Sequence, residues 1–266
     1  MALGIMSFGM PTLIETSTLD ECAKLCAELG LDFIELNMNL PQYQLDKINV
    51  DYFKSIAHKY GIYYTIHLEE NLNVCDFNSY VAEAYIKTVA DTIKIAKQLD
   101  IKVLNMHMAK GVYFTLPDRK VLLFSEYKEQ YLKNIIEFRN MCKTAIGEND
   151  IKICIENCDG YEDFQKEAIE ILLESDVFAL TFDVGHNHGI GGTDKDFVMQ
   201  HKNRLNHIHL HDAQARKNHL ALGTGEMDIE KYLNLAKEQN CRVVLETKTI
   251  DGLKQSVEWL KGFNNA

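Results

Sequence analysis

The feature that most constrains the fold is a regular alternation of short β-rich runs with longer helical patterns. Each run is rich in apolar and β-branched residues, and each is followed by a segment whose apolar residues recur at helical spacing. Eight such repeats predict a (β/α)8 barrel, the TIM barrel, as a single domain over residues 1–266. The predicted strands are "LGIMSF" (3–8), "FIELNM" (33–38), "YYTIHL" (63–68), "VLNMHM" (103–108), "KICIEN" (152–157), "ALTFDVG" (179–185), "NHIHLHD" (206–212) and "RVVLET" (242–247).

The predicted helices have recognisable ends. In "STLDECAKLCAELG", Thr18 and Glu21 have the spacing of a capping box, and Gly30 follows the apolar stripe as a terminator. The longest helix is predicted from Ser79 to Leu99 by the same criteria. A doubly wound open sheet is the alternative architecture, but no glycine-rich phosphate loop follows the first predicted strand. No linker or low-complexity segment divides the sequence.

Composition narrows the function classes. The formal charge of −11 argues against a general binder of polyanions, whose surface needs basic patches. Seven scattered cysteines without a CxxC pair suit buried thiols in a reducing compartment better than a disulfide framework. The N-terminal "MALGIMSFGM" lacks the basic region of a signal peptide, and no run of about 18 apolar residues could span a membrane. We therefore expect a cytoplasmic protein without a membrane partner.

Metal-capable side chains stand at the ends of six predicted strands. In a TIM barrel, active-site residues lie where strands end and βα loops begin. Alternation along each strand places these side chains inside the barrel, while their apolar neighbours face the helices. The residues are His67, His107, Glu156, Asp183 with His186 just beyond it, His209 or His211, and Glu246; Glu35 and Asn37 have the same parity on the second strand.

These strand ends together predict a divalent metal site. A single histidine or aspartate in such a place is more often structural, but six strand ends that supply only His, Asp or Glu need a common explanation. Barrel interiors are otherwise filled by branched apolar side chains, and an unpaired buried carboxylate is costly. Mixed nitrogen and oxygen ligands suit Mn²⁺, Co²⁺, Zn²⁺ or Mg²⁺ rather than a metal that prefers thiolates.

The motifs and their order resemble the xylose isomerase-like TIM barrels. They are "HL" at 67, "NMH" at 107, "IEN" at 156, "FDVGH" at 183–186, "HIHLHDA" at 207–213, "HLALGTGEMD" at 219–228 and "LET" at 245–247. That superfamily includes sugar-phosphate isomerases and epimerases, and also apurinic endonucleases of the endonuclease IV type. In the isomerases and epimerases, the resemblance implies one divalent metal held by Glu156, Asp183, His209 and Glu246.

The same resemblance assigns the other residues of "HIHLHD". It implies that His207 lies deeper in the barrel and is structural. His211 and Asp212 are expected at the rim, where they meet substrate or orient the loop.

The endonuclease IV type holds three zinc ions in the same barrel. The resemblance places its additional ligands on His67, His107, His186 and His219. One ligand of the third zinc is missing, because Lys217 stands where that type has an aspartate. An ammonium close to a dication is repelled by roughly several kcal/mol at intermediate effective dielectric. The sequence therefore predicts at most two metals per chain and disfavours the nuclease.

The function expected first is a metal-dependent isomerase or epimerase of a sugar or sugar phosphate. The metal polarises a carbonyl and stabilises an enediolate, while Glu156 and Glu246 remove and return a proton. Glu35, His186 and Lys217 are expected to bind the substrate. The alternative is an AP endonuclease that hydrolyses a phosphodiester, since the charge balance disfavours nucleic acid without excluding it. A non-catalytic sugar-binding barrel leaves the paired glutamates unexplained, and a homo-oligomer stays open.

Two surface features bear on the substrate. The loop "NLPQYQLDKIN" (39–49) is a candidate nucleic-acid-binding insertion, although its Gln42 and Tyr43 could instead close over a sugar. A basic rim suits a phosphate on either kind of substrate, or is simply a solvated surface. This rim comprises Lys110, Arg119, Lys120, Arg216, Lys217 and Lys248.

Overall fold

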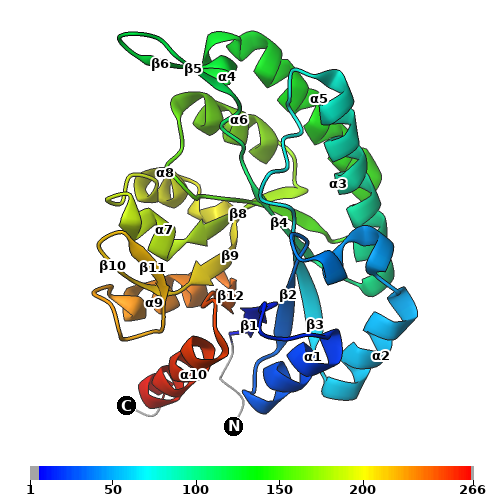
Figure 1. Cartoon of the computed structure of the whole chain (residues 1–266), viewed down its shortest axis with the longest axis vertical. Coiled ribbons are helices and arrows are strands. Elements are labelled where there is room, and N and C mark those ends of the chain that lie inside the picture. Colours follow the sequence, from blue (N-terminus) through cyan, green and yellow to red (C-terminus); the bar gives the residue numbers. More distant parts are fainter. Residues whose placement is uncertain (1–5, 265–266) are drawn as a thin grey trace.

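A closed parallel barrel organises the chain. The computed structural model describes residues 6–264, and within them eight parallel strands close in the order β1-β12-β9-β8-β7-β4-β3-β2, with helices around them (Figure 1). The TIM barrel predicted from the sequence is therefore confirmed. The barrel strands are β1 (Phe8–Pro11), β2 (Phe33–Asn37), β3 (Tyr63–His67), β4 (Val103–His107), β7 (Lys152–Glu156), β8 (Phe178–Asp183), β9 (Leu205–Leu210) and β12 (Arg242–Leu245).

The helices follow the strands in the predicted rhythm. The longest, α3, begins at Ser79 and ends at Leu99 as predicted, and the side chain of Thr18 accepts a hydrogen bond from the backbone N–H of Glu21 to cap α1. The helices are α1 (Leu19–Glu28), α2 (Val50–Tyr60), α3 (Ser79–Leu99), α4 (Leu123–Glu126), α5 (Lys128–Ile146), α6 (Asp163–Leu173), α7 (Val184–Gly189), α8 (Lys195–Gln200), α9 (Ile229–Gln239) and α10 (Ile250–Asn264), with short 3-10 turns at Pro41–Tyr43, Leu45–Lys47 and Lys202–Arg204.

The first barrel strand lies later in the chain than the sequence predicts. Of the predicted residues 3–8, residues 3–5 lie outside the described part, and strand structure begins only at Phe8. The strand contains Gly9, where a Cβ would lie 2.4 Å from the ring of Phe33. The glycine therefore lets the aromatic ring of β2 pack directly on the backbone of β1, a role that an apolar pattern does not reveal.

Two small hairpins were not predicted. One is formed by β5 (Tyr113–Thr115) and β6 (Lys120–Leu122) and projects from the body at the top of Figure 1. The other is formed by β10 (Asp212–Gln214) and β11 (Lys217–Leu220). The predicted strand 206–212 therefore ends at Leu210. Both hairpins are too short to show a clear alternation of apolar and polar residues.

The barrel strands have two different faces. Their outward apolar side chains pack against the helices in one large core, whereas Val103, Cys154 and Ala179 form a small separate apolar cluster. These three residues precede polar strand-end residues by two or four positions, so the same alternating face carries both. The interior is consequently apolar towards the strand starts and polar towards their carboxyl ends.

All seven cysteines are free, and all except Cys158 are buried, in agreement with the expected buried thiols. None of the helices within residues 6–264 is long and apolar enough to cross a membrane.

Arg204 joins the starting ends of two strands that carry site residues at their far ends. Its guanidinium donates to the carbonyl oxygen of Leu173 at 2.6 Å, of Ser175 at 2.8 Å and of Phe178 at 2.6 Å. Ser175 and Phe178 lie at the entry to β8, and β9 begins directly after Arg204. The side chain therefore ties β9 to the connection that leads into β8.

We predict that Arg204→Met lowers the free energy of unfolding by about 2–3 kcal/mol, because hydrogen bonds from a charged donor are lost and half-buried carbonyls lose their partner. Lys202→Met in the same 3-10 turn is the control, since Lys202 is exposed. Urea unfolding followed by circular dichroism measures both. Equal midpoints for the two variants would show that the clamp does not stabilise the barrel.

Candidate metal centre and active site

Four side chains meet at the carboxyl end of the barrel. Glu156 ends β7, Asp183 ends β8, His209 lies near the end of β9, and Glu246 directly follows β12. One donor atom from each lies within 4.8 Å of the others, and all four side chains are buried. The structure thus brings together the four residues that the sequence resemblance singled out.

His209 lies at the centre of this four-residue cluster. Its Nδ1 is 2.8 Å from Oε1 of Glu156, 3.2 Å from Oε2 of Glu246 and 3.9 Å from Oδ2 of Asp183. Its Nε2 is 2.8 Å from Oε1 of Glu35 on the opposite side. Burial acts to lower the pKa of His209, but Glu156, Glu35 and Glu246 outweigh it and raise that pKa well above its usual range.

The four-residue cluster fits a divalent cation. Oε2 of Glu246 is buried without a hydrogen-bond partner among the described residues, and it faces Nδ1 of His209. Burial acts to raise the pKa of Glu156 and of Glu246, yet His209 holds both well below their usual range. Ionised carboxylates that converge in this way repel one another unless a cation lies between them. Carboxylate oxygens with one imidazole suit the divalent ions expected from the sequence.

A second group of possible ligands adjoins Glu156. Oε2 of Glu156 is 3.0 Å from Nε2 of His107 and 3.3 Å from Nε2 of His67, and it accepts a hydrogen bond from the amide of Asn105. His67 also places its Nδ1 2.7 Å from the carbonyl oxygen of Leu68. Because Nδ1 of His67 donates its proton to this carbonyl, Nε2 of a neutral His67 has only a lone pair. The contact between this Nε2 and the carboxylate of Glu156 then requires a proton or another cation between the two atoms. Burial acts to lower the pKa of His67, but Glu156 raises it to about 9.

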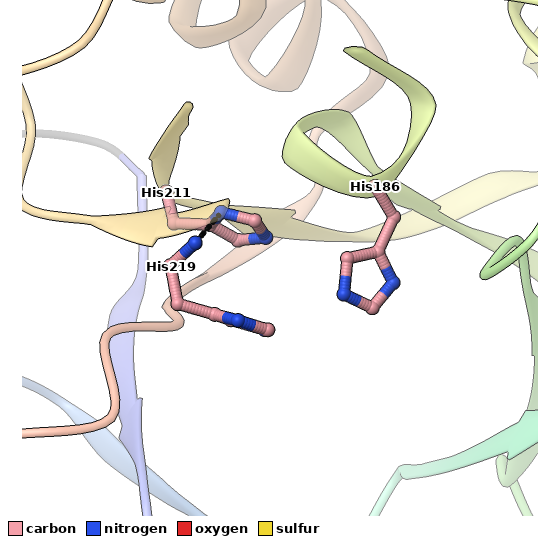
Figure 2. A group of neighbouring side chains, drawn as sticks. All are labelled: His186, His211 and His219. Carbon is pink, nitrogen blue, oxygen red and sulfur yellow. Dashed lines mark hydrogen bonds between the residues drawn. The ribbon is translucent and has the colours of Figure 1, made fainter. Parts of the chain in front are cut away.

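A third group consists of His186, His211 and His219 (Figure 2). The backbone N–H of His219 donates to Nδ1 of His211 at 2.8 Å, so the proton of a neutral His211 lies on Nε2. That Nε2 is 3.1 Å from Oδ1 of Asp183, to which it donates. His211 is thus engaged at both nitrogens, and it orients Asp183 within the four-residue cluster.

The other two imidazoles of this group remain available. Nδ1 of His186 and Nε2 of His219 are buried, and neither has a hydrogen-bond partner in the part of the chain that the structure describes. Burial lowers the pKa of His219 to about 3, which keeps it neutral. A Cβ on Gly185 would lie 2.0 Å from Cε1 of His211, so the start of α7 can lie against this ring only with glycine.

The structure revises the expectations for Lys217 and Asp212. Lys217 is exposed on β11, and His211 is the residue that lies with His186 and His219. Asp212 is buried, and its carboxylate accepts hydrogen bonds from the backbone N–H groups of three loop residues. These are Ala213, Gly225 and Met227. Of the two roles considered for Asp212, orienting the loop is therefore the one that its contacts support.

Glu35 does not occupy the substrate-binding position expected from the sequence. Its side chain is 2% exposed and lies beneath His209. Its carboxylate accepts hydrogen bonds from Nε2 of His207 at 2.9 Å and from the hydroxyl of Thr65 at 3.1 Å, and its Oε1 lies 2.8 Å from Nε2 of His209. Both oxygens are engaged inside the barrel, which is why substrate cannot reach them. His207 is fully buried at the deep position that the resemblance implies.

Thr65 and Asn105 were missed by the sequence reasoning. They contact Glu35 and Glu156, respectively, and each precedes a strand-end histidine by two residues. The same alternation that identified His67 and His107 could have found them.

The expected basic rim is dispersed. Lys110 donates to the carbonyl oxygen of Asp159, whereas Arg119 and Lys120 belong to the projecting β5–β6 hairpin. Lys248 approaches the centre most closely, with Nζ 2.7 Å from Oε1 of Glu246. Tyr43 is 1% exposed, so it packs in the core and does not close over a ligand.

Two cavities share Cys158 and Asp159 of the loop after β7. One, of about 350 Å³, is lined by His107, Glu156 and Lys110 among others. The second, of about 480 Å³, is lined by His186 and Arg216. Both volumes lie in the range of small-molecule sites, about 300–1,000 Å³.

Comparison with known proteins places this geometry in context. The family model described as the xylose isomerase-like TIM barrel matches residues 23–263. The uncharacterized protein MJ1188 of Methanocaldococcus jannaschii is 24% identical over 217 residues, which cover 77% of this chain and 74% of that protein.

Solved structures show the same fold. A D-tagatose 3-epimerase-like protein has a TM-score of 0.80 at 23% identity, covering 98% of this chain and 97% of its own. D-psicose 3-epimerase, solved in the presence of D-fructose, has a TM-score of 0.73 at 14% identity and 98% coverage of both chains. The IOLI protein, solved with a zinc atom, has a TM-score of 0.71 at 16% identity and 96% coverage of both.

We predict that the purified protein contains at least one divalent metal per chain. After treatment with a chelator, adding Mn²⁺, Co²⁺ or Zn²⁺ should raise the melting temperature, because an ion that binds only the native state stabilises it. Asp183→Asn and His209→Gln should lose this response, measured by elemental analysis and thermal unfolding.

The control for this prediction is His188→Gln. His188 belongs to the same helix as His186, but its Nε2 pairs with the exposed Glu226 at 2.9 Å, outside the cluster. It should keep the metal. Metal-free native protein whose melting temperature ignores all three ions would contradict the prediction.

Proposed function

Because the chain belongs to the xylose isomerase-like TIM barrel family, we propose that it is a metal-dependent epimerase or isomerase of a sugar or sugar phosphate. The observation that carries the proposal is the cluster of Glu156, Asp183, His209 and Glu246 at the carboxyl end of the barrel. The epimerases among the structural neighbours support it at the level of the fold. The zinc atom in a third neighbour supports a divalent metal.

In this proposal, Glu156, Asp183, His209 and Glu246 hold the metal, which supplies Lewis-acid polarisation of the substrate carbonyl. Hard oxygen donors with one imidazole leave its identity open among Mn²⁺, Co²⁺, Zn²⁺ and Mg²⁺. The contacts outside the cluster fix each ligand. His211 orients Asp183, and Lys248 holds Oε1 of Glu246, so that Oε2 faces the centre.

Glu156 and Glu246 are proposed to transfer the proton. β7 and β12 are separated by β8 and β9 in the barrel, so the two carboxylates approach the centre from different sides. One removes the proton next to the carbonyl, and the other supplies a proton. Delivery to the opposite face of the same carbon inverts it, and delivery to the neighbouring carbon gives an isomer. His186, half-buried beside the larger cavity, is placed to hydrogen-bond a substrate hydroxyl.

A second candidate function is metal-dependent hydrolysis of a phosphodiester at an abasic site. It is favoured by the group of His67, His107 and Glu156, which a single-metal isomerase does not require. Two observations count against it. Both nitrogens of His211 are hydrogen-bonded, so this residue is not free to bind a further zinc ion together with His186 and His219. The net charge of −11 disfavours binding of nucleic acid. We rank it below the epimerase or isomerase.

We predict that Glu156→Gln and Glu246→Gln each lower kcat by about 100-fold or more, because the amide keeps the shape and loses the basicity. Sugar binding should survive in part. Glu129→Gln, on the exposed face of α5, is the control. In D₂O the native enzyme should introduce deuterium at the reacting carbon. Turnover without any solvent exchange would point to a hydride shift and remove the proton-transfer roles.

A substrate panel separates the two candidate functions. The Mn²⁺-loaded protein should interconvert at least one ketose or ketose phosphate and leave a duplex with an abasic site intact. Sugars analysed by chromatography and the oligonucleotide by gel electrophoresis give the readout. Cleavage of the duplex without turnover of any sugar would place the nuclease first.

A further inference from the structure

We infer that Glu35 is a positioning residue that keeps the proton of His209 on Nε2 and so presents the Nδ1 lone pair to the metal. This inference rests on the metal site of the proposed function. It replaces the substrate-binding role that the sequence suggested for Glu35 with a role beneath the site.

The donors around Glu35 determine the state of its carboxylate. Three groups lie within 3.1 Å of it: Nε2 of His207 and the hydroxyl of Thr65 hydrogen-bond one oxygen, and Nε2 of His209 lies 2.8 Å from the other. An ionised carboxylate has only acceptor sites, so each neighbour has to donate. We therefore place a proton on Nε2 of both imidazoles. In His209, the Nδ1 that contacts Glu156 at 2.8 Å is then the nitrogen whose proton a metal can replace.

The position of His209 determines which of its two ring nitrogens can bind a metal. Its Nε2 faces Glu35 at 2.8 Å, whereas its Nδ1 faces Glu156 at 2.8 Å and Glu246 at 3.2 Å. The hydrogen bond made by one ring nitrogen decides which nitrogen is free for a metal. A carboxylate partner also makes the imidazole a more basic ligand, and loss of such a partner typically weakens metal binding about 10–100-fold.

The depth of Glu35 rules out a direct role at the reacting atoms. Its side chain is 2% exposed, that of His209 is fully buried, and the cavity-lining residues come from other strands. Glu35 therefore acts only through the imidazole above it. Its effect should appear in metal binding even when no substrate is present.

The first test needs no variant. In the zinc-loaded native protein labelled with ¹⁵N-histidine, His209 should carry a proton on Nε2 that exchanges slowly with solvent and resonates at low field, and none on Nδ1. Zinc bound to Nε2, with the proton on Nδ1, would overturn the inference. A native protein that binds no zinc would overturn it together with the proposed metal site.

The second test compares Glu35→Leu with Thr65→Val by zinc competition against a chelator. Leucine offers no acceptor, so the affinity for zinc should fall about 10–100-fold and the Nε2 proton signal should broaden or disappear. Thr65→Val removes one neutral donor to the same carboxylate and leaves Glu35 facing His209, so it should weaken zinc binding less than Glu35→Leu does and keep the Nε2 signal. A folded Glu35→Leu variant that binds zinc as tightly as the native protein would contradict the inference alone, because the metal site would still stand.

Discussion

The burial of three carboxylates around one imidazole is the constraint on which this end of the barrel depends. Glu156, Asp183 and Glu246 are at most 6% exposed and converge on His209. Removing each ion from water costs several kcal/mol even after the protein relaxes. The neighbouring imidazoles and the ammonium of Lys248 offset part of this cost. In the proposed function, a divalent cation bound by these residues would offset the rest.

The two faces of each strand let one set of residues serve the core and another serve the site. Outward apolar side chains such as Ile155 and Phe182 pack beneath the helices, while the inward neighbours Glu156 and Asp183 enter the cluster. Around the cluster, Glu35 supports His209 from below and His211 supports Asp183 from the side. The side chains of the cluster are thus held by contacts with residues of neighbouring strands.

Much of this could be predicted from the sequence because alternation and order are local properties. The barrel and the full length of α3 follow from periodicity, and strand ends place polar side chains at one end of the barrel. The choice of Glu156, Asp183, His209 and Glu246 among them came from the family resemblance.

What failed depends on contacts between distant segments. Alternation along β2 predicts that the side chain of Glu35 points into the barrel. It does not reveal that this side chain lies deep in the barrel and is only 2% exposed. That His211 lies with His186 and His219 depends on the β10–β11 hairpin, which linear position does not reveal. The close packing of the Phe33 ring on Gly9 of β1 likewise joins segments that are distant in the sequence.

The most direct test of the account is anomalous diffraction from crystals grown with Co²⁺, recorded on both sides of the cobalt absorption edge. The account predicts a strong peak surrounded by carboxylate oxygens of Glu156, Asp183 and Glu246 and by Nδ1 of His209. A peak that does not touch these four residues, or no peak in crystals that diffract well, would contradict it.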